Sequence, residues 1–87
     1  MNELDGVVAI VTGSSSGIGE RTAQRLSELG ASVVVNSSSS VDAGEAVAAS
    51  LPGPSAYVQA DIADADQCRH LLDATIERFG HLERLRQ

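Results

Sequence analysis

The sequence predicts an α/β fold in which three strands alternate with three helices along the chain. Three observations favour this class: β-branched runs of strand length, apolar residues at helical spacing between them, and glycine or proline at the segment ends. Strands that alternate with helices in this way form a parallel sheet through right-handed crossovers. We therefore expect a β-α-β-α-β-α domain whose strands lie in the spatial order 3-2-1, as in half of a doubly wound sheet.

The first strand is predicted at residues 7–11, where five apolar residues follow one another. Such a run is typical of a strand that is buried on both faces of a parallel sheet. A helix should follow, and Gly30 stands where a glycine commonly ends a helix. The apolar face of that helix is expected to contain Ile18, Thr22, Leu26 and Leu29.

The second strand is predicted at residues 32–36, around three consecutive valines. The four serines that follow, residues 37–40, are few enough to form a loop. A second helix is expected from about Asp42. Pro52 should end it, because proline cannot continue a helix and restricts the residue before it.

The third strand, at residues 56–60, has a weaker pattern. The helix after it should begin at Asp64, because Gln67 three residues later completes a capping box, in which each side chain binds the other residue's backbone N–H. Gly80 is expected to end this helix. Its apolar positions form the clearest amphipathic pattern of the chain: Cys68, Leu71, Leu72, Thr75, Ile76 and Phe79.

The composition limits the classes of function. The chain has 87 residues, a net charge of −6 and no lysine, so we expect one small domain that does not bind nucleic acid. We find neither a basic, apolar leader nor a run of about 20 apolar residues, so the expected compartment is the cytoplasm and no membrane contact is expected. Cys68 has no partner for an internal disulfide, and His70 and His81 lack the spacing of a metal site.

A glycine-rich turn, Thr12–Gly19, lies between the first strand and the first helix and reads TGSSSGIG. Glycine permits a positive φ and lets a ligand approach the backbone closely. The turn would present that ligand to a helix N-terminus, where N–H groups and the helix dipole favour a pyrophosphate. A tight strand–helix turn without a ligand is the alternative, whereas a P-loop is excluded because it requires lysine.

This turn resembles the T-G-x-x-x-G-x-G fingerprint of the short-chain dehydrogenase/reductase family. Two further segments are similar to the family pattern: Asp61-Ile62 after the third strand, and residues 77–82, which resemble the segment leading into the family's fourth strand. The likeness covers about residues 4–82. It implies the cofactor-binding part of an NAD(P)-dependent oxidoreductase, with a truncated Rossmann fold that lacks the fourth strand and the catalytic half.

By this resemblance, the turn wraps the adenosine ribose and the pyrophosphate of the cofactor. Asp61 would accept a hydrogen bond from the adenine amino group, with the backbone of Ile62 beside it. From the residues alone, the alternative for Asp61 is an acid that caps the following turn. The residues of the turn that the resemblance implies are Gly13, Ser15, Ser16, Gly17, Ile18 and Gly19.

The choice between NAD and NADP depends on the end of the second strand, which here is Asn36 followed by Ser37. An acid at this place selects NAD by binding the ribose 2′-hydroxyl, and a nearby arginine accommodates the 2′-phosphate of NADP. The loop has neither, but hydroxyl and N–H groups can hold a phosphate. NADP is therefore favoured over NAD, and a solvated loop without preference is the alternative.

The residues that carry the family's chemistry, a Ser, a Tyr-x-x-x-Lys and an Asn, are not found in this sequence. Tyr57, the only tyrosine, is followed at the fourth position by Asp61, and we expect it in the core or on the sheet surface. We therefore expect residues 1–87 to form an N-terminal, partial cofactor-binding domain that does not itself catalyse, with residues 83–87 as a divergent tail.

Two alternatives remain for the whole chain: a stand-alone nucleotide-binding module, or the inert product of a frameshifted gene. The second would explain Arg86-Gln87. Family members tend to have Val-Asn at this place, and one inserted base converts codons for Val-Asn into codons for Arg-Gln. In each case the first strand would lack its second neighbour, and an apolar strand edge favours self-association.

Overall fold

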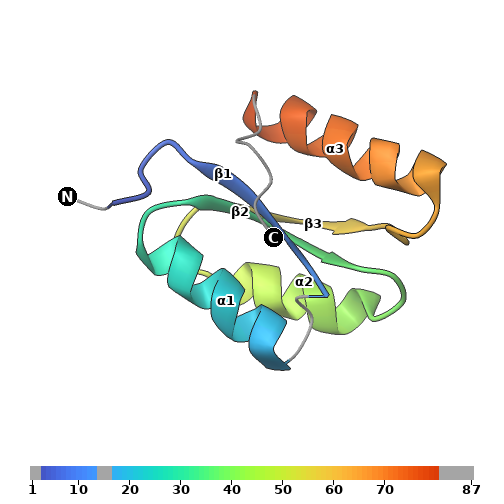
Figure 1. Ribbon diagram of the computed structural model, residues 1–87. Helices are drawn as coiled ribbons and strands as arrows, with labels where there is room; N and C mark the ends of the chain where they lie inside the picture. The colour runs from blue at the N-terminus through green and yellow to red at the C-terminus, as the bar shows by residue number, and fades with distance from the viewer. Residues whose placement is uncertain (1–2, 14–16, 81–87) are drawn as a thin grey trace.

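The computed structural model describes residues 3–13 and 17–80. Its strands form a parallel sheet with β2 between β1 and β3 (Figure 1). This arrangement confirms the predicted α/β class, the β-α-β-α-β-α order and the 3-2-1 order of the strands. The elements are β1 (Val8–Thr12), α1 (Gly17–Glu28), β2 (Ser32–Ser37), α2 (Val41–Ser50), β3 (Ser55–Gln59) and α3 (Ala65–Phe79).

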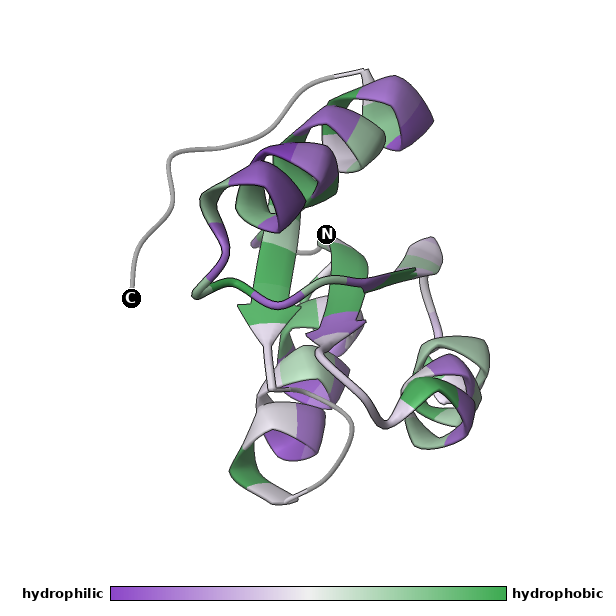
Figure 2. Cartoon of the chain, turned by 90° about the vertical axis from the view of Figure 1, so that its right-hand side faces the viewer, coloured by the Kyte–Doolittle hydropathy of each residue, from purple (hydrophilic) through white to green (hydrophobic). Residues whose placement is uncertain are grey.

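Helices α1 and α2 cover one face of the sheet, and α3 covers the other (Figure 1). Val33 and Val35 on β2 pack with α1 and α2, whereas Val34 packs with Leu71 of α3. Successive residues of a strand point to opposite faces, so a strand with helices on both sides needs apolar residues at every position. Figure 2 accordingly shows hydrophobic colour along the strands and hydrophilic colour over much of α3.

Strand β1 is less buried than its sequence predicts. Val8 is 3% exposed, but Ala9, Ile10 and Val11 are only partly buried. In the described part of the chain β1 is hydrogen-bonded to β2 alone, so it lies at an edge of the sheet. Burial on both faces is therefore confirmed for β2 and is wrong for most of β1.

Helix α1 packs on the sheet through small residues and only in part through the expected apolar face. Ala23 and Ser27 are buried, whereas Ile18 is 84% exposed and Thr22 is exposed. The hydroxyl of Ser27 accepts a hydrogen bond of 2.9 Å from the backbone N–H of Gly53, which satisfies a buried polar group. Of the predicted face, Leu26 packs against the core and Leu29 is half-buried, so the prediction is wrong for Ile18 and Thr22 only.

Helices α2 and α3 end as predicted. Leu51, the residue before Pro52, follows α2 with an extended backbone at φ −74° and ψ 141°. Gly80 follows α3 in the left-handed conformation at φ 83°, and Gly30 after α1 has φ 105°. None of the helices in the described part combines the length and hydrophobicity that a bilayer span requires.

The first turn of α3 confirms only half of the expected capping box. The Asp64 carboxylate accepts hydrogen bonds from the N–H groups of Asp66 and Gln67, at 2.9 and 3.1 Å. The Gln67 side chain does not return to Asp64. Its Oε1 accepts from the N–H of Asp61 at 2.8 Å, because the chain turns tightly there and the Asp64 N–H already donates to the Asp61 carbonyl.

Candidate functional site

The carboxyl ends of the strands meet at one edge of the sheet. Thr12 of β1 is in register with Asn36 of β2, and Ser37 of β2 is in register with Gln59 of β3. The segments that follow these residues are the glycine-rich turn, the serine loop and the turn at Asp61. Ligands of open α/β sheets bind outside the carboxyl ends of the strands, so this edge is the candidate site.

The described part of the glycine-rich turn has the conformation that requires glycine. Gly13 and Gly17 have φ angles of +64° and +63°, and α1 begins at Gly17. Apart from their chain neighbours, no group of the described residues lies within 4 Å of the place where a side chain would begin at either glycine. Ser15 and Ser16 lie outside the described residues.

Two exposed apolar side chains stand at this same edge. Ile18 in the first turn of α1 is 84% exposed, and Ile62 after β3 is 48% exposed. A fully exposed isoleucine forgoes about 2 kcal/mol of burial free energy, although single exposed apolar residues are common on protein surfaces and Ile76 of α3 is also 46% exposed. Ile18 thus lies on the surface at this edge and not in the core, and Gly19, the next residue, is half-buried within α1.

The last two residues of β2, Asn36 and Ser37, have buried side chains. Asn36 is 2% exposed, and its Nδ2 donates to the carbonyls of Val58 on β3 and of Ala60 just after it, at 3.0 and 3.2 Å. Ser37 is 6% exposed, and its hydroxyl lies 2.6 Å from that of Tyr57. The exposed residues here are the next three, 38–40, which belong to the loop whose hydroxyl and N–H groups the sequence analysis considered for a phosphate.

Asp61 holds its own turn in place. Its Oδ1 accepts a hydrogen bond from the N–H of Ala63 at 3.0 Å, and its N–H donates to Gln67. This is the capping role that the sequence left as the alternative. The Asp61 carboxylate is nevertheless exposed at the sheet edge, beside the exposed Ile62.

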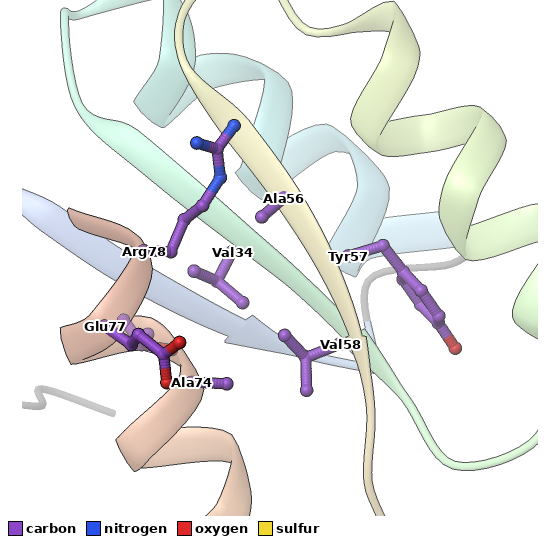
Figure 3. Close-up of a pocket in the computed structure, with 8 residues that line it drawn as sticks. Val34, Ala56, Tyr57, Val58, Ala74, Glu77 and Arg78 are labelled. Carbon is purple, nitrogen blue, oxygen red and sulfur yellow. The ribbon is translucent and has the colours of Figure 1, made fainter.

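The remaining candidate residues form no site of their own. The Tyr57 ring lies on the α2 side of β3, as Figure 3 shows, and is half-buried. Cys68 is a half-buried free thiol, and His70 is exposed. The described residues contain no cluster of three potential metal ligands, and His81 lies outside them.

A hollow of about 460 Å³ lies between α3 and the sheet (Figure 3). It is lined by Val34, Ala56 and Val58 on the strands and by Ala74, Thr75, Glu77 and Arg78 on α3. Ala56 is near the start of β3, and the α3 residues are near the end of that helix. The hollow therefore lies toward the amino ends of the strands, away from the glycine-rich turn.

Comparison with known proteins decides the family. The family model described as short chain dehydrogenase matches residues 7–87. The chain belongs to the short-chain dehydrogenase family. A family relative named as a ketoacyl reductase of the granaticin polyketide synthase of Streptomyces violaceoruber is 51% identical over 76 residues, which are 87% of this chain and 30% of the relative. Elsinochrome reductase 1 of Elsinoe fawcettii is 41% identical over 85 residues, 94% of this chain and 32% of the relative.

Solved structures of the family have the same fold. A short chain dehydrogenase from Mycobacterium avium superposes with a TM-score of 0.88 at 33% identity, over 94% of this chain and 33% of that one. A 7α-hydroxysteroid dehydrogenase, solved with NADH and 7-oxo glycochenodeoxycholic acid, gives a TM-score of 0.85 at 33% identity, over 91% of this chain and 32% of that one. The chain thus spans about a third of the length of these family members.

Proposed function

We propose that the carboxyl edge of the sheet binds a dinucleotide, and that residues 1–87 are the partial cofactor-binding domain of a family oxidoreductase. The observation that carries this proposal is the meeting of three features at one edge. They are the positive-φ glycines Gly13 and Gly17, the N-terminus of α1, and the exposed side chains of Ile18 and Ile62. Backbone N–H groups at a helix N-terminus favour a pyrophosphate, and exposed aliphatic side chains suit the face of an adenine ring.

Each turn has a part in this proposal. The glycine-rich turn, Gly13–Gly19 with Ser15 and Ser16, surrounds the pyrophosphate and the adenosine ribose. The Asp61 carboxylate accepts a hydrogen bond from the adenine amino group while its Oδ1 continues to hold the turn, and the Ile62 backbone lies beside the base. Support comes from the exposure of Asp61 and Ile62 and from the 7α-hydroxysteroid dehydrogenase, whose structure contains NADH.

We propose NADP as the preferred cofactor, with NAD as the alternative. No acid stands at residues 36–40 to repel a 2′-phosphate, and the hydroxyls of Ser38, Ser39 and Ser40 are exposed where Asn36 and Ser37 are buried. Hydroxyl groups and the first N–H groups of α2 are suitable donors to a phosphate. In this proposal, Asn36 and Ser37 hold the exposed serines in position through their hydrogen bonds to β3 and the turn after it.

The chemistry proposed for the longer family protein is hydride transfer between the cofactor and a carbonyl or alcohol. The names of the two relatives, a ketoacyl reductase and elsinochrome reductase 1, support carbonyl reduction. The present residues do not catalyse it alone, because they include no lysine and their only tyrosine, Tyr57, packs on α2. The cytoplasm is the proposed compartment.

Titration of the purified chain with NADPH and NADH tests the proposal. Saturable binding is expected, with NADPH tighter than NADH. Asp61→Asn should weaken both cofactors about threefold to tenfold, because a charged acceptor is worth more than a neutral one. Asp73→Asn, the same change at an exposed position of α3, should leave both affinities unchanged. Absence of saturable binding to the wild-type chain would contradict the proposal.

A further inference from the structure

The loop between β2 and α2 is held by side chains of β3. The Tyr57 hydroxyl lies 2.6 Å from Ser37 Oγ, at the end of β2. Gln59 Nε2, two residues further along β3, donates to the Ser38 carbonyl at 3.0 Å. The loop that carries the exposed serines is therefore attached to a neighbouring strand and not only to its own ends.

The Tyr57 and Ser37 hydroxyls form one network with two backbone carbonyls. Ser37 Oγ lies 3.2 Å from the Ser40 carbonyl and the Tyr57 hydroxyl lies 3.5 Å from the Ser37 carbonyl, so either hydroxyl can donate in the 2.6 Å bond that joins them. The Ser40 carbonyl also accepts from the Gly44 N–H at 2.9 Å, the first helical bond of α2. A chain of hydrogen bonds thus runs from β3, through the end of β2, into the first turn of α2.

Gly44 makes the close approach possible. A Cβ atom at this position would overlap the Tyr57 ring at Cε1 and Cδ1. Glycine is unfavourable inside a helix compared with alanine, but here it leaves the room that the ring occupies. Tyr57 points from β3 toward α2 in Figure 3, with its hydroxyl at the far end of the side chain.

We propose that Tyr57 is a positioning residue for cofactor selectivity, which it exerts by fixing the serine loop through Ser37. The inference rests on the proposed dinucleotide function. Residues 36–40 contain no lysine or arginine, so the 2′-phosphate is held there by neutral hydroxyl and N–H donors. Such hydrogen bonds weaken steeply when they are misaligned, whereas the attraction of a cation does not depend on angle in this way. Selectivity for the phosphorylated cofactor therefore depends on a fixed loop.

The decisive variant is Tyr57→Phe, which keeps the ring against Gly44 and removes only the hydroxyl. For the full chain, we expect NADPH to bind about threefold to tenfold more weakly, as for one lost hydrogen bond, and NADH to change less than twofold. Ser37→Ala should have the same effect, and the double variant should add nothing further, because both changes break one network.

Ser55→Ala is the matched control. Ser55 Oγ donates to the Ala48 carbonyl at 2.7 Å, so this change also removes a bond from β3 to α2, but near the opposite end of the helix. The ratio of the NADPH and NADH affinities should stay at the wild-type value. An unchanged ratio in Tyr57→Phe, or an equal change in Ser55→Ala, would overturn the inference, as would a wild-type chain that binds NADH alone.

Hydrogen exchange separates this inference from the proposed function. If the wild-type chain binds neither dinucleotide, the proposed function fails, and cofactor selectivity fails with it. The exchange rates of the backbone amides of residues 38–41 still test, without any cofactor, whether Tyr57 fixes the loop. They should rise severalfold in Tyr57→Phe and stay constant in Ser55→Ala, and equal rates in both variants would overturn that claim.

Discussion

At the scale of single residues, buried polar side chains link elements that are distant in sequence. The Asn36 amide donates to two carbonyls of the neighbouring strand and its turn, and the Ser27 hydroxyl accepts from the loop before β3. The Thr75 hydroxyl, which is fully buried, donates to the Leu71 carbonyl within α3. Among the described residues, no buried side-chain nitrogen or oxygen lacks a hydrogen-bond partner. These hydrogen bonds offset the desolvation free energy that burial of a polar group costs.

The cap of α3 gives a prediction at this scale. Asp64→Ala should lower the free energy of unfolding by about 1 kcal/mol, because two backbone N–H groups lose their acceptor. Urea unfolding followed by circular dichroism measures the change. Asp73→Ala in the exposed middle of the same helix should be neutral or slightly stabilising, since alanine is the better helix former. A loss for Asp73→Ala as large as that for Asp64→Ala would contradict the capping role.

The sequence predicted hydrogen bonds between residues a few positions apart, but not those between different elements. Asp64 was expected as a cap because its partners are two and three residues away. The second half of the box was wrong because Gln67 reaches Asp61, whose position depends on the end of β3. The role of Asn36 depends on the register of β2 with β3, where it lies opposite Val58. Register is not encoded near Asn36, so the cross-strand hydrogen bonds of its amide could not be predicted, and its contact with the cofactor stays a prediction.

At the scale of elements, similar sequence runs lead to different burial. Residues 7–11 and 33–35 both predict a strand that is buried on two faces, but only β2 has a strand on each side in the described structure. The number of neighbours of a strand is a long-range property, so the class and order of elements were predictable and the burial of β1 was not. Helix α1 shows the same limit, since Ala23 and not Ile18 meets the sheet.

The contact between α2 and β3 gives a prediction at this scale. Glycine to alanine in a helix usually stabilises by about 1 kcal/mol, but Gly44→Ala should destabilise by about 1–2 kcal/mol, because the new Cβ overlaps the Tyr57 ring. In a Tyr57→Val background the same change should become stabilising. The difference between the two backgrounds, measured by urea unfolding, is the test. An equal effect in both would show that the ring does not oppose a side chain at position 44.

At the scale of the whole molecule, the chain is small and its core is divided. One apolar cluster lies beneath α1 and α2, and a smaller one lies beneath α3. A chain of this length buries only about 60–65% of the surface that it exposes when unfolded, so we expect low stability for these residues alone. Self-association through the edge of β1, expected from its apolar sequence, stays a prediction that sedimentation of the purified chain tests.

Low stability makes ligand binding easy to detect by heating. At a concentration one hundred times the Kd, NADPH should add about 2.7 kcal/mol, which corresponds to a rise in Tm of roughly 10–20 °C for a domain of this size. Differential scanning calorimetry measures the rise. Gly17→Val should abolish it, because a β-branched residue does not tolerate the φ of +63° in the turn. A rise of the same size in Gly17→Val would place the binding site away from this turn.

The packing of Tyr57 against Gly44 has a consequence for how such chains diverge. The two positions are complementary in volume, so a single change at position 44 is harmful while an aromatic ring stands at position 57. A change at position 57 must come first, and only then is position 44 released for alanine or a larger residue. Natural sequences with this sheet should therefore keep or lose the pair together, and a tyrosine at 57 beside a branched residue at 44 should be rare among them.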